Sequence, residues 1–332
     1  MEIAEQRALL TKLVSERYGH RGATLQPISP YIFEDRGIYR VNCEDGTYVL
    51  RAFLFDAEAF LIGHAAVLDY LQTFDFPAPR AYRTRDGEIL ARYEGWTALL
   101  VSFIQGEDAD FTPDKLERLA EYVGWLHNRT SSIVMDVAGT TLSDSSRRPT
   151  HCAGQAIERL RRASVDAPEE LRGFYADTIA TLQRIWQAHR EGLLPEVLIH
   201  GDCWPGNAVL TGRDEIAMID WDCAGVGPAI LDVGYLLLTC HLGKPQLPAM
   251  QPDEERIAAV VRGYRRVREL SSAERSVLKE AILYDVARRT GLDIVSSGIV
   301  ETWREDIRWQ KMLARYAVSA PIAEIAGKYF AE

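Results

Sequence analysis

Residues 39–52 alternate between apolar and polar side chains on either side of the short segment Glu44-Asp45-Gly46. A period of two is typical of a strand, and an Asp-Gly pair between two such runs favours a tight turn. The pattern therefore predicts a strand, a turn and a returning antiparallel strand. We expect a second hairpin around Asp86-Gly87 and a buried strand at 98–104, so that residues 25–104 form a small antiparallel sheet.

Helical periodicity dominates the remaining chain. Thr112-Pro113-Asp114 combines a capping hydroxyl, a proline at the first helical position and an acid in the first turn, which is typical of a helix start. Strand-like residues return only at 197–220. Helices are predicted at or near the following residues: 2–18, 57–71, 154–163, 168–190, 253–268, 272–290 and 299–328.

The chain has 332 residues, more than one compact core usually supports. We expect an α+β protein of two domains: an N-terminal lobe at 1–104 with a small antiparallel sheet, and a mostly helical C-terminal lobe at 105–332.

Composition and charge exclude some classes of binding partner. The net charge of −10 argues against a nucleic-acid partner, because phosphate binding needs a basic surface. We also expect no membrane partner, since no apolar run approaches the roughly 18 residues that span a bilayer. The N-terminal MEIAEQRALL lacks the features of a secretory signal, so we expect a cytoplasmic protein. The five cysteines are scattered, with no CxxC pair, which argues against disulfides and zinc.

The segment HGDCWPGN, residues 200–207, lies between the apolar runs VLI and AVL. A returning strand ends at Asp220, which predicts that Asp202, Asn207 and Asp220 lie near one another. Carboxylate and amide oxygens suit Mg²⁺, which usually completes its shell with phosphates and water. A further carboxylate beside such a metal can accept a proton from a nucleophile. Together these groups favour a phosphotransferase, whose reaction needs positioning and charge neutralisation.

HGDCWPGN and the following MIDWDCAGVGPAILDVGYLL resemble the aminoglycoside phosphotransferase and choline kinase superfamily. Its pattern is His-Gly-Asp, four residues and Asn, then Ile-Asp, with Gly-Pro and Asp downstream. YRVNCEDGTYVLRAF and the helix ending in GWLHNR are similar to that family more weakly. The resemblance implies a bilobal protein-kinase-like fold. It also implies ATP and Mg²⁺ as cofactors, and transfer of the γ-phosphoryl group to a hydroxyl of a small molecule.

The resemblance also implies roles for individual residues. Asp202 corresponds to the catalytic base that accepts or orients the proton of the acceptor hydroxyl, while Asn207 and Asp220 correspond to the Mg²⁺ ligands. His200 and Asp232 would support the loop. The residues implied to bind the nucleotide are Arg51, for the α/β-phosphates, and the connector whose backbone meets the purine: Ser102, Phe103, Ile104 and Gln105.

Two features depart from the family pattern. Kinases of this fold usually pair the strand cation with a Glu on the next helix, but that position falls near His64, and Glu58 lies about two turns too early. It is open whether Glu58, His64 or neither orients Arg51. The segment FEDRGIYR, expected to cover the phosphates, contains a single glycine, Gly37.

Several readings remain open from the sequence. A protein Ser/Thr kinase of the same fold, a nucleotide-binding pseudokinase and a metal-dependent hydrolase are the alternatives to a small-molecule kinase. The acceptor, the choice between ATP and GTP, the oligomeric state and the roles of Asp222 and Trp204 are undecided. Some C-terminal residues are predicted to form a solvated face or the core, with a substrate site as the alternative: Glu301, Glu305, Asp306, Trp303, Trp309 and Tyr316.

Overall fold

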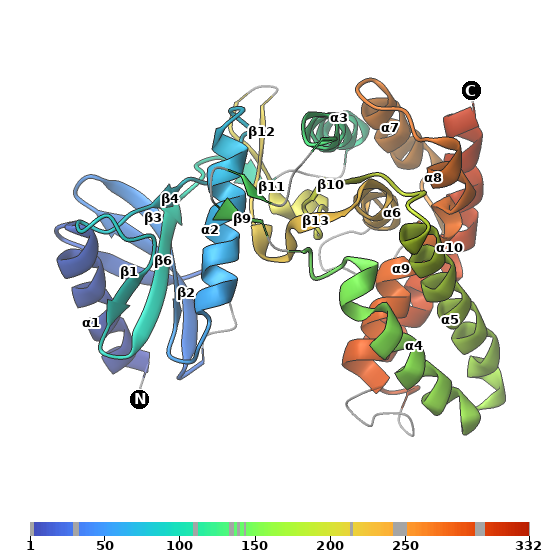
Figure 1. Ribbon diagram of the computed structural model, residues 1–332, viewed down its shortest axis with the longest axis horizontal. Helices are drawn as coiled ribbons and strands as arrows, with labels where there is room; N and C mark the ends of the chain where they lie inside the picture. The colour runs from blue at the N-terminus through green and yellow to red at the C-terminus, as the bar shows by residue number, and fades with distance from the viewer. Residues whose placement is uncertain are drawn as a thin grey trace. The chain divides into compact units, whose positions relative to one another are not determined.

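The computed structural model describes residues 3–28, 33–108, 112–132, 136–137, 140–142, 144–212, 215–241, 251–295 and 303–331 (Figure 1). The chain divides into two compact units. The first comprises Met1–Gly106, Asp136–Leu142 and Ala217–Ile219, and the second comprises Glu107–Met135, Ser143–Ile216 and Asp220–Glu332. Because the first unit contains an antiparallel sheet and the second is mostly helical, the predicted α+β class is confirmed.

The sheet of the first unit has the strand order β1-β2-β3-β6-β4, with β5 also paired to β6. Its strands are β1 (Thr24–Pro27), β2 (Arg36–Cys43), β3 (Gly46–Phe53), β4 (Ala81–Tyr82), β5 (Ala91–Tyr93) and β6 (Trp96–Ser102). β2 and β3 form the predicted hairpin, in register from Arg36 opposite Phe53 to Cys43 opposite Gly46.

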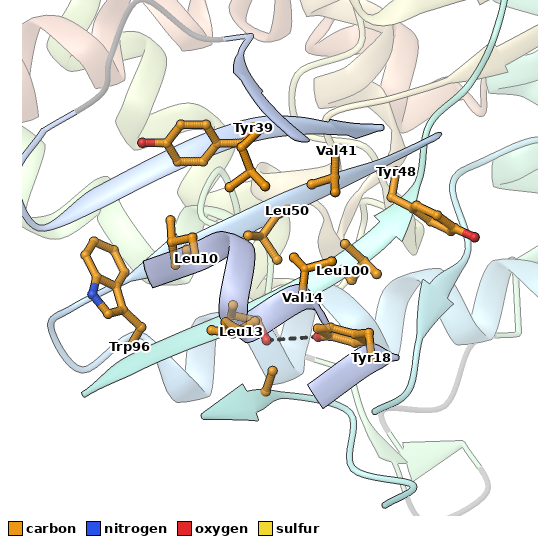
Figure 2. Close-up of a cluster of buried hydrophobic side chains, with 14 residues drawn as sticks. Leu10, Leu13, Val14, Tyr18, Tyr39, Val41, Tyr48, Leu50, Trp96 and Leu100 are labelled. Atoms are coloured by element: carbon orange, nitrogen blue, oxygen red, sulfur yellow. Dashed lines mark hydrogen bonds between the residues drawn. The ribbon is translucent and has the colours of Figure 1, made fainter. Parts of the chain in front are cut away.

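Two helices lie on opposite faces of this sheet (Figure 1). Helix α1 (Ile3–Leu13) continues into a short π-helical turn, Val14–Tyr18, and packs on one face through Leu10 and Leu13. There it meets buried side chains of β2, β3 and β6, among them Val41 and Leu50 (Figure 2). Helix α2 (Glu58–Gln72) contacts β4 and β6. Because side chains alternate along a strand, the face away from α1 carries Arg51.

The predicted hairpin around Asp86-Gly87 is wrong. Gly87 closes a local turn, donating to the Thr84 carbonyl at 2.9 Å, but the flanking strands do not pair with each other. Instead, β4 and β5 both pair with β6. The turn that joins β5 to β6 is Glu94-Gly95, where both residues have positive φ, as the favoured two-residue hairpin turn requires. The apolar run of β6 therefore provides the pairing partner for both short strands.

The second unit is built mainly from helices. They are α3 (Pro113–Arg129), α4 (Pro149–Val165), α5 (Glu169–Arg190), α6 (Ala229–Thr239), α7 (Glu254–Arg265), α8 (Ser272–Ser276), α9 (Leu278–Arg289) and α10 (Ile307–Ala331). Among the pairs in contact are α3 with α7, α4 with α5, and α6 with α9. Within the parts of the chain that the structure describes, no helix is long and apolar enough to cross a membrane.

Two helix predictions need correction, and one helix was not predicted. The helix predicted at 272–290 is interrupted at Val277, which separates α8 from α9. The helix predicted at 299–328 begins at Ile307, and residues 299–302 lie outside the described residues. Helix α6 has no predicted counterpart. Every residue of α6 is buried, so it lacks the polar face whose period marks a surface helix in a sequence.

The short strands outside the six-stranded sheet are only partly as predicted. Residues 197–220 contain β10 (Glu196–Ile199), β11 (Ala208–Leu210) and β12 (Ile216–Met218). However, β10 pairs with β13 (Gly225–Pro228), while β11 lies between β12 and β7 (Glu107–Asp108). Two further short strands, β8 (Asp136–Val137) and β9 (Thr140–Thr141), pair with each other. Short strands of two to four residues carry too little periodicity to be recognised.

Candidate active site

Asp202 and Asn207 are in direct contact in the loop that follows β10. Nδ2 of Asn207 donates to the carboxylate oxygen Oδ2 of Asp202 at 2.9 Å and to the Asp202 carbonyl at 2.9 Å. The amide oxygen of Asn207 therefore faces away from Asp202. The side chain of Asp202 is 22% exposed, so one part of this fixed carboxylate remains accessible. The loop presents a carboxylate and an amide oxygen in one defined arrangement.

Asp232, on the first turn of α6, binds the backbone of the loop at residues 200–207. Its carboxylate accepts hydrogen bonds from the backbone amides of His200 at 2.7 Å and Gly201 at 2.9 Å, and lies 3.3 Å from Nε2 of His127. Burial raises the pKa of Asp232, but hydrogen bonds from His127 and the His200 amide outweigh it. The net pKa lies below its ordinary value. Asp232 therefore acts on the loop as a carboxylate.

His200 supports the same loop from inside. It is fully buried, and its Nδ1 lies 3.2 Å from the backbone nitrogen of Asp202, which donates to it. Its ring centroid lies 4.5 Å from that of Trp221. Both His200 and Asp232 thus contact backbone atoms next to Asp202, as their expected supporting role requires.

Gly201 allows the loop to pass close to a neighbouring segment. Its φ is +74°, and a Cβ atom there would lie 2.2 Å from the carbonyl oxygen of Cys223. Gly192 also has a positive φ, +70°, but a Cβ there would meet nothing within 4 Å. The two glycines therefore differ in steric room rather than in backbone conformation.

We expect Gly201→Ala to lower the free energy of unfolding by about 3 kcal/mol or more, against about 1–2 kcal/mol for Gly192→Ala. Gly192→Ala experiences only the strain of positive φ, whereas Gly201→Ala adds a clash with backbone atoms. Urea denaturation of both variants measures the difference. Equal losses would show that the loop moves away from Cys223 without cost.

Asp220 lies at the same end of a hairpin as Asn207. β11 and β12 are neighbours in one sheet, and Thr211 donates to the Glu215 carbonyl at 3.1 Å in the short connection. So short a connection requires antiparallel strands. Asn207, just before β11, and Asp220, two residues after β12, therefore share one end. Asp220 has φ 62° and ψ 59°, a left-handed conformation that is uncommon for a residue other than glycine.

The donor set here suits a hard cation that also binds phosphates. Among the described residues, no group of three His, Cys, Asp or Glu side chains is placed to hold a metal ion. A cation beside this loop would depend on the Asn207 amide oxygen, the Asp220 carboxylate and oxygens from a ligand. Mg²⁺ is commonly bound in that way, through one or two protein oxygens plus phosphates and water. These residues therefore fit a magnesium nucleotide.

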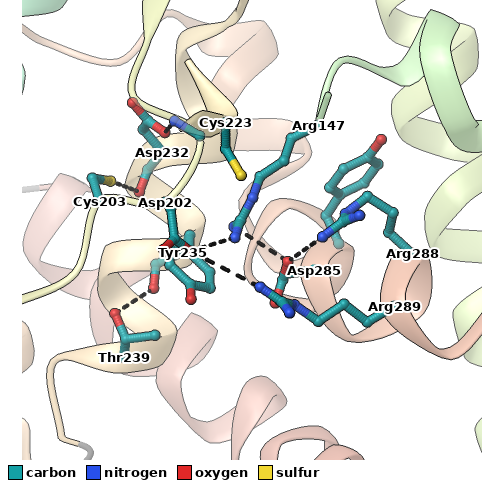
Figure 3. Close-up of polar contacts among 12 residues, drawn as sticks. Arg147, Asp202, Cys203, Cys223, Asp232, Tyr235, Thr239, Asp285, Arg288 and Arg289 are labelled. Atoms are coloured by element: carbon teal, nitrogen blue, oxygen red, sulfur yellow. Dashed lines mark hydrogen bonds and ion pairs between the residues drawn. The ribbon is translucent and has the colours of Figure 1, made fainter. Parts of the chain in front are cut away.

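Arg147 is a further residue of the site that the sequence did not indicate. It precedes α4, is 3% exposed, and its Nη2 lies 2.6 Å from Oδ1 of Asp202. Its Nη1 lies 3.2 Å from Oδ1 of Asp285 on α9, and its guanidinium lies 4.1 Å from the ring centroid of Tyr235 (Figure 3). Arg147 occupies a stretch read as a polar loop, and its partners are 55 or more residues away. Nothing local in the sequence marks it.

In the first unit, Arg51 lies on β3 and is 7% exposed, so it is not the solvated strand residue that its charge would suggest. His64, on α2, is also 7% exposed. Glu58 at the start of α2 accepts a hydrogen bond from Nη2 of Arg92 at 2.6 Å. Glu58 is therefore paired with Arg92, on β5.

Some backbone groups of the connector at the end of β6 already form hydrogen bonds within the first unit. The Ser102 amide donates to the Arg80 carbonyl at 2.9 Å, and the Ser102 hydroxyl accepts from the Arg80 amide at 2.9 Å. The Phe103 amide donates to the Thr47 carbonyl at 3.3 Å. Ile104 and Gln105 follow outside any strand, and Gln105 is exposed. The four connector residues therefore differ in how much of their backbone is engaged inside the unit.

The remaining singled-out residues are mostly structural. Trp309 is fully buried against Phe174, and the Tyr316 hydroxyl donates to Asp177 at 2.7 Å. Asp306 pairs with Arg308 near the start of α10. Trp303 is partly buried, Glu305 is exposed, and Glu301 lies outside the described residues. The ring of Trp204 packs on the α-carbon of Gly206, where a Cβ would lie 2.3 Å from it.

Comparison with known proteins identifies the family. A model of the phosphotransferase enzyme family matches residues 33–270, well over half of the chain. The chain belongs to this family of phosphotransferases, as the motif at 200–207 predicted.

A homoserine kinase of Beijerinckia indica is 26% identical over 221 residues, covering 64% of this chain and 62% of the relative. A homoserine kinase of Pseudomonas aeruginosa is 26% identical over 202 residues, covering 59% of each protein. The chain thus spans about three fifths of the length of these relatives. An amicoumacin kinase solved with AMP-PNP and Ca²⁺ superimposes with a TM-score of 0.66 at 17% identity, covering 97% of this chain and 96% of the other. The predicted protein-kinase-like fold is confirmed.

Proposed function

We propose that this protein is a Mg²⁺-dependent kinase that transfers the γ-phosphoryl group of ATP to a hydroxyl group of a small molecule. The observation that carries the proposal is the fixed pair of Asp202 and Asn207. One side of the pair offers an accessible carboxylate, and the other offers an amide oxygen suited to a cation. Membership of the phosphotransferase family supports the reaction type.

In this proposal Asp202 is the catalytic base. The hydroxyl of the acceptor donates its hydrogen bond to the Asp202 carboxylate, which orients the oxygen for attack and takes the proton as the new P–O bond forms. The bond between the γ-phosphorus and the bridging oxygen breaks, and ADP leaves. Asn207 and Arg147 each hold one oxygen of that carboxylate, so its direction is set before the acceptor binds.

The Asn207 amide oxygen and the Asp220 carboxylate would hold Mg²⁺ on the nucleotide phosphates. Mg²⁺, when bound, neutralises charge on the transferred phosphoryl group. The left-handed backbone at Asp220 supports this role, because strained conformations gather at functional sites.

Asp220→Ala is expected to raise the Mg²⁺ concentration needed for half-maximal activity by about tenfold or more, since one of two protein ligands is lost. Nucleotide binding in the presence of Mg²⁺ should weaken as well. Isothermal titration with AMP-PNP, with and without Mg²⁺, separates the two effects. Unchanged Mg²⁺ dependence would remove Asp220 from the metal site.

The nucleotide contacts proposed in the first unit are Arg51, for the α/β-phosphates, and the connector, for the purine. Since the amides of Ser102 and Phe103 bond inside the sheet, a purine would use the backbone of Ile104 and Gln105. Backbone groups of this kind read the purine edge and do not separate ATP from GTP by side-chain chemistry.

The test of the function is ATP turnover over a panel of hydroxylated small molecules, with L-homoserine first because two relatives are homoserine kinases. Production of ADP that depends on the acceptor, together with a phosphorylated acceptor seen by mass spectrometry, is the expected result. ATP binding with no transfer to any acceptor would favour the pseudokinase reading. Transfer to protein hydroxyls only would favour the protein kinase reading.

A further inference from the structure

Four arginines converge on one buried carboxylate beside Asp202. Asp285 on α9 is 3% exposed and has guanidinium groups on both oxygens (Figure 3). Oδ1 lies 3.2 Å from Nη1 of Arg147 and 3.2 Å from Nη2 of Arg288, while Oδ2 lies 2.9 Å from Nε of Arg289. Nη1 of Arg315, on α10, lies 3.7 Å from Oδ2. This arrangement differs from an ordinary surface ion pair, because one buried carboxylate is paired with four guanidinium groups.

The cluster carries more positive than negative charge. Within the described part of the chain, its ion pairs join four arginines to two carboxylates, Asp285 and Asp202. Four positive and two negative charges leave a surplus of two positive charges. Buried charge is expensive unless it is paired, so a surplus of this kind favours an anion from outside the protein.

Arg289 is the member of the cluster that an anion can reach. Its side chain is 36% exposed, whereas those of Arg147 and Arg315 are 4% and 7% exposed. Its Nε is held by Asp285 at 2.9 Å, which fixes the plane of the guanidinium. Nη2 lies 3.9 Å from Oδ1 of Asp202, beyond hydrogen-bond distance but close to the carboxylate. The guanidinium is therefore anchored beside Asp202, on a side chain that is partly accessible to solvent.

The two oxygens of Asp202 face different partners. Asn207, which we propose to hold Mg²⁺ on the nucleotide phosphates, bonds Oδ2. Arg147 and Arg289 lie at Oδ1. The arginines are thus on the side of Asp202 away from the group assigned to the phosphates. We therefore expect an anion bound on the Oδ1 side to be part of the acceptor and not of the nucleotide.

We propose that Arg289, backed by Arg147, forms a carboxylate-binding subsite, so that the acceptor carries a carboxylate close to the hydroxyl that is phosphorylated. That the ligand of this subsite is the acceptor rests on the proposed function. A planar guanidinium can bind a carboxylate in a paired, bidentate geometry. The same positive charge disfavours acceptors that present only an ammonium group to this position.

Three pairs of compounds test the proposal, each differing by one carboxylate: L-serine and 2-aminoethanol, L-threonine and 1-aminopropan-2-ol, and L-homoserine and 3-aminopropan-1-ol. Their binding is measured by titration calorimetry in the presence of Mg²⁺ and AMP-PNP, and their phosphorylation is measured with ATP. Malonate, which has no hydroxyl, serves as a simple anion probe. At least one acid should bind about tenfold or more tightly than its carboxylate-free partner.

Arg289→Gln should remove that preference, and Arg289→Lys should keep part of it because the charge remains. Lys279→Gln is the matched control, because it removes one positive charge from the other end of α9, about 15 Å away along the helix. It should leave the preference unchanged. Malonate should raise the melting temperature of the wild type, relative to chloride at equal ionic strength, and should do so less in Arg289→Gln.

Each of the other possible outcomes either supports or overturns the carboxylate-binding subsite. Equal or tighter binding of the amino alcohols, without any stabilisation by malonate, overturns the subsite. So does a loss of AMP-PNP affinity in Arg289→Gln with ADP affinity retained, because the arginine would then hold the γ-phosphoryl group. Binding of an acid that depends on Arg289, with no transfer to any acceptor, supports the subsite and contradicts the proposed function.

Discussion

Asp202→Ala is expected to lower kcat for phosphoryl transfer by about 10²–10⁴-fold, the usual contribution of a positioned general base. Neither of the two side chains that hold its carboxylate can replace it. Arg147, which contacts one oxygen of Asp202, is a cation and cannot accept the proton. Asn207, on the other oxygen, is a neutral amide that donates its hydrogen bond. Kinetics with saturating acceptor and ATP measure the effect directly.

The same variant should bind Mg²⁺-AMP-PNP within about threefold of the wild type, because Asp202 is not one of the proposed metal ligands. The fold should persist, since Arg147 keeps Asp285 as an ion-pair partner. Asp69→Ala, which breaks an exposed ion pair with Arg83 in the first unit, is the control for loss of a carboxylate. A rate close to that of the wild type in Asp202→Ala would assign the base to another residue.

Much of the loop was predictable because its information is local. The His-Gly-Asp and Asn spacing lies within eight residues, and the contact between Asp202 and Asn207 follows from that short span. The β2–β3 hairpin is equally local, since its alternation and its turn are contiguous in the chain. Such features depend on nearest neighbours, and a single sequence contains them completely.

The features that escaped prediction depend on residues far apart in the chain. Arg147 meets Asp202 across 55 residues and Asp285 across many more, and nothing in the sequence of a polar loop or an arginine-rich helix end marks the pairing. Helix α6 escaped for a different reason, because a fully buried helix has no polar face. The β5–β6 turn was missed because a second Gly-containing turn, near Asp86, had the more obvious sequence.

The surroundings of Asp202 depend both on the local loop sequence and on residues that are distant in the chain. The loop sequence places the carboxylate and its amide partner, while the helical residues around it decide its electrostatic surroundings. Asp232 fixes the backbone of the loop from α6, and Arg147 connects the carboxylate to α9. The candidate catalytic loop is therefore encoded locally, whereas the arginines that we propose to select the acceptor are brought together only by the tertiary structure.

Asp285→Asn is expected to lower the free energy of unfolding by about 3–5 kcal/mol, because it leaves buried arginines without their carboxylate. For a helical unit of this size, that loss corresponds to a fall in melting temperature of about 10 °C. Glu280→Gln, on the same helix, is the matched control. Glu280 pairs with the exposed Arg184, and a surface pair of that kind contributes about 1 kcal/mol or less. Calorimetry and urea denaturation of both variants measure the contrast.

The pH dependence gives a second, independent signature of the same cluster. Burial raises the pKa of Asp285, but the arginines outweigh it and hold the pKa far below the ordinary aspartate value of 3.8. A depressed native pKa contributes stability above the ordinary value, and that stability is lost as pH falls below it, because the unfolded chain takes up the proton first. The stability gap between wild type and Asp285→Asn should therefore be constant near neutrality and should shrink below about pH 4. A gap that is absent at neutral pH would mean that the four arginines do not need this carboxylate, and the charge surplus proposed to bind the acceptor would have to be balanced elsewhere.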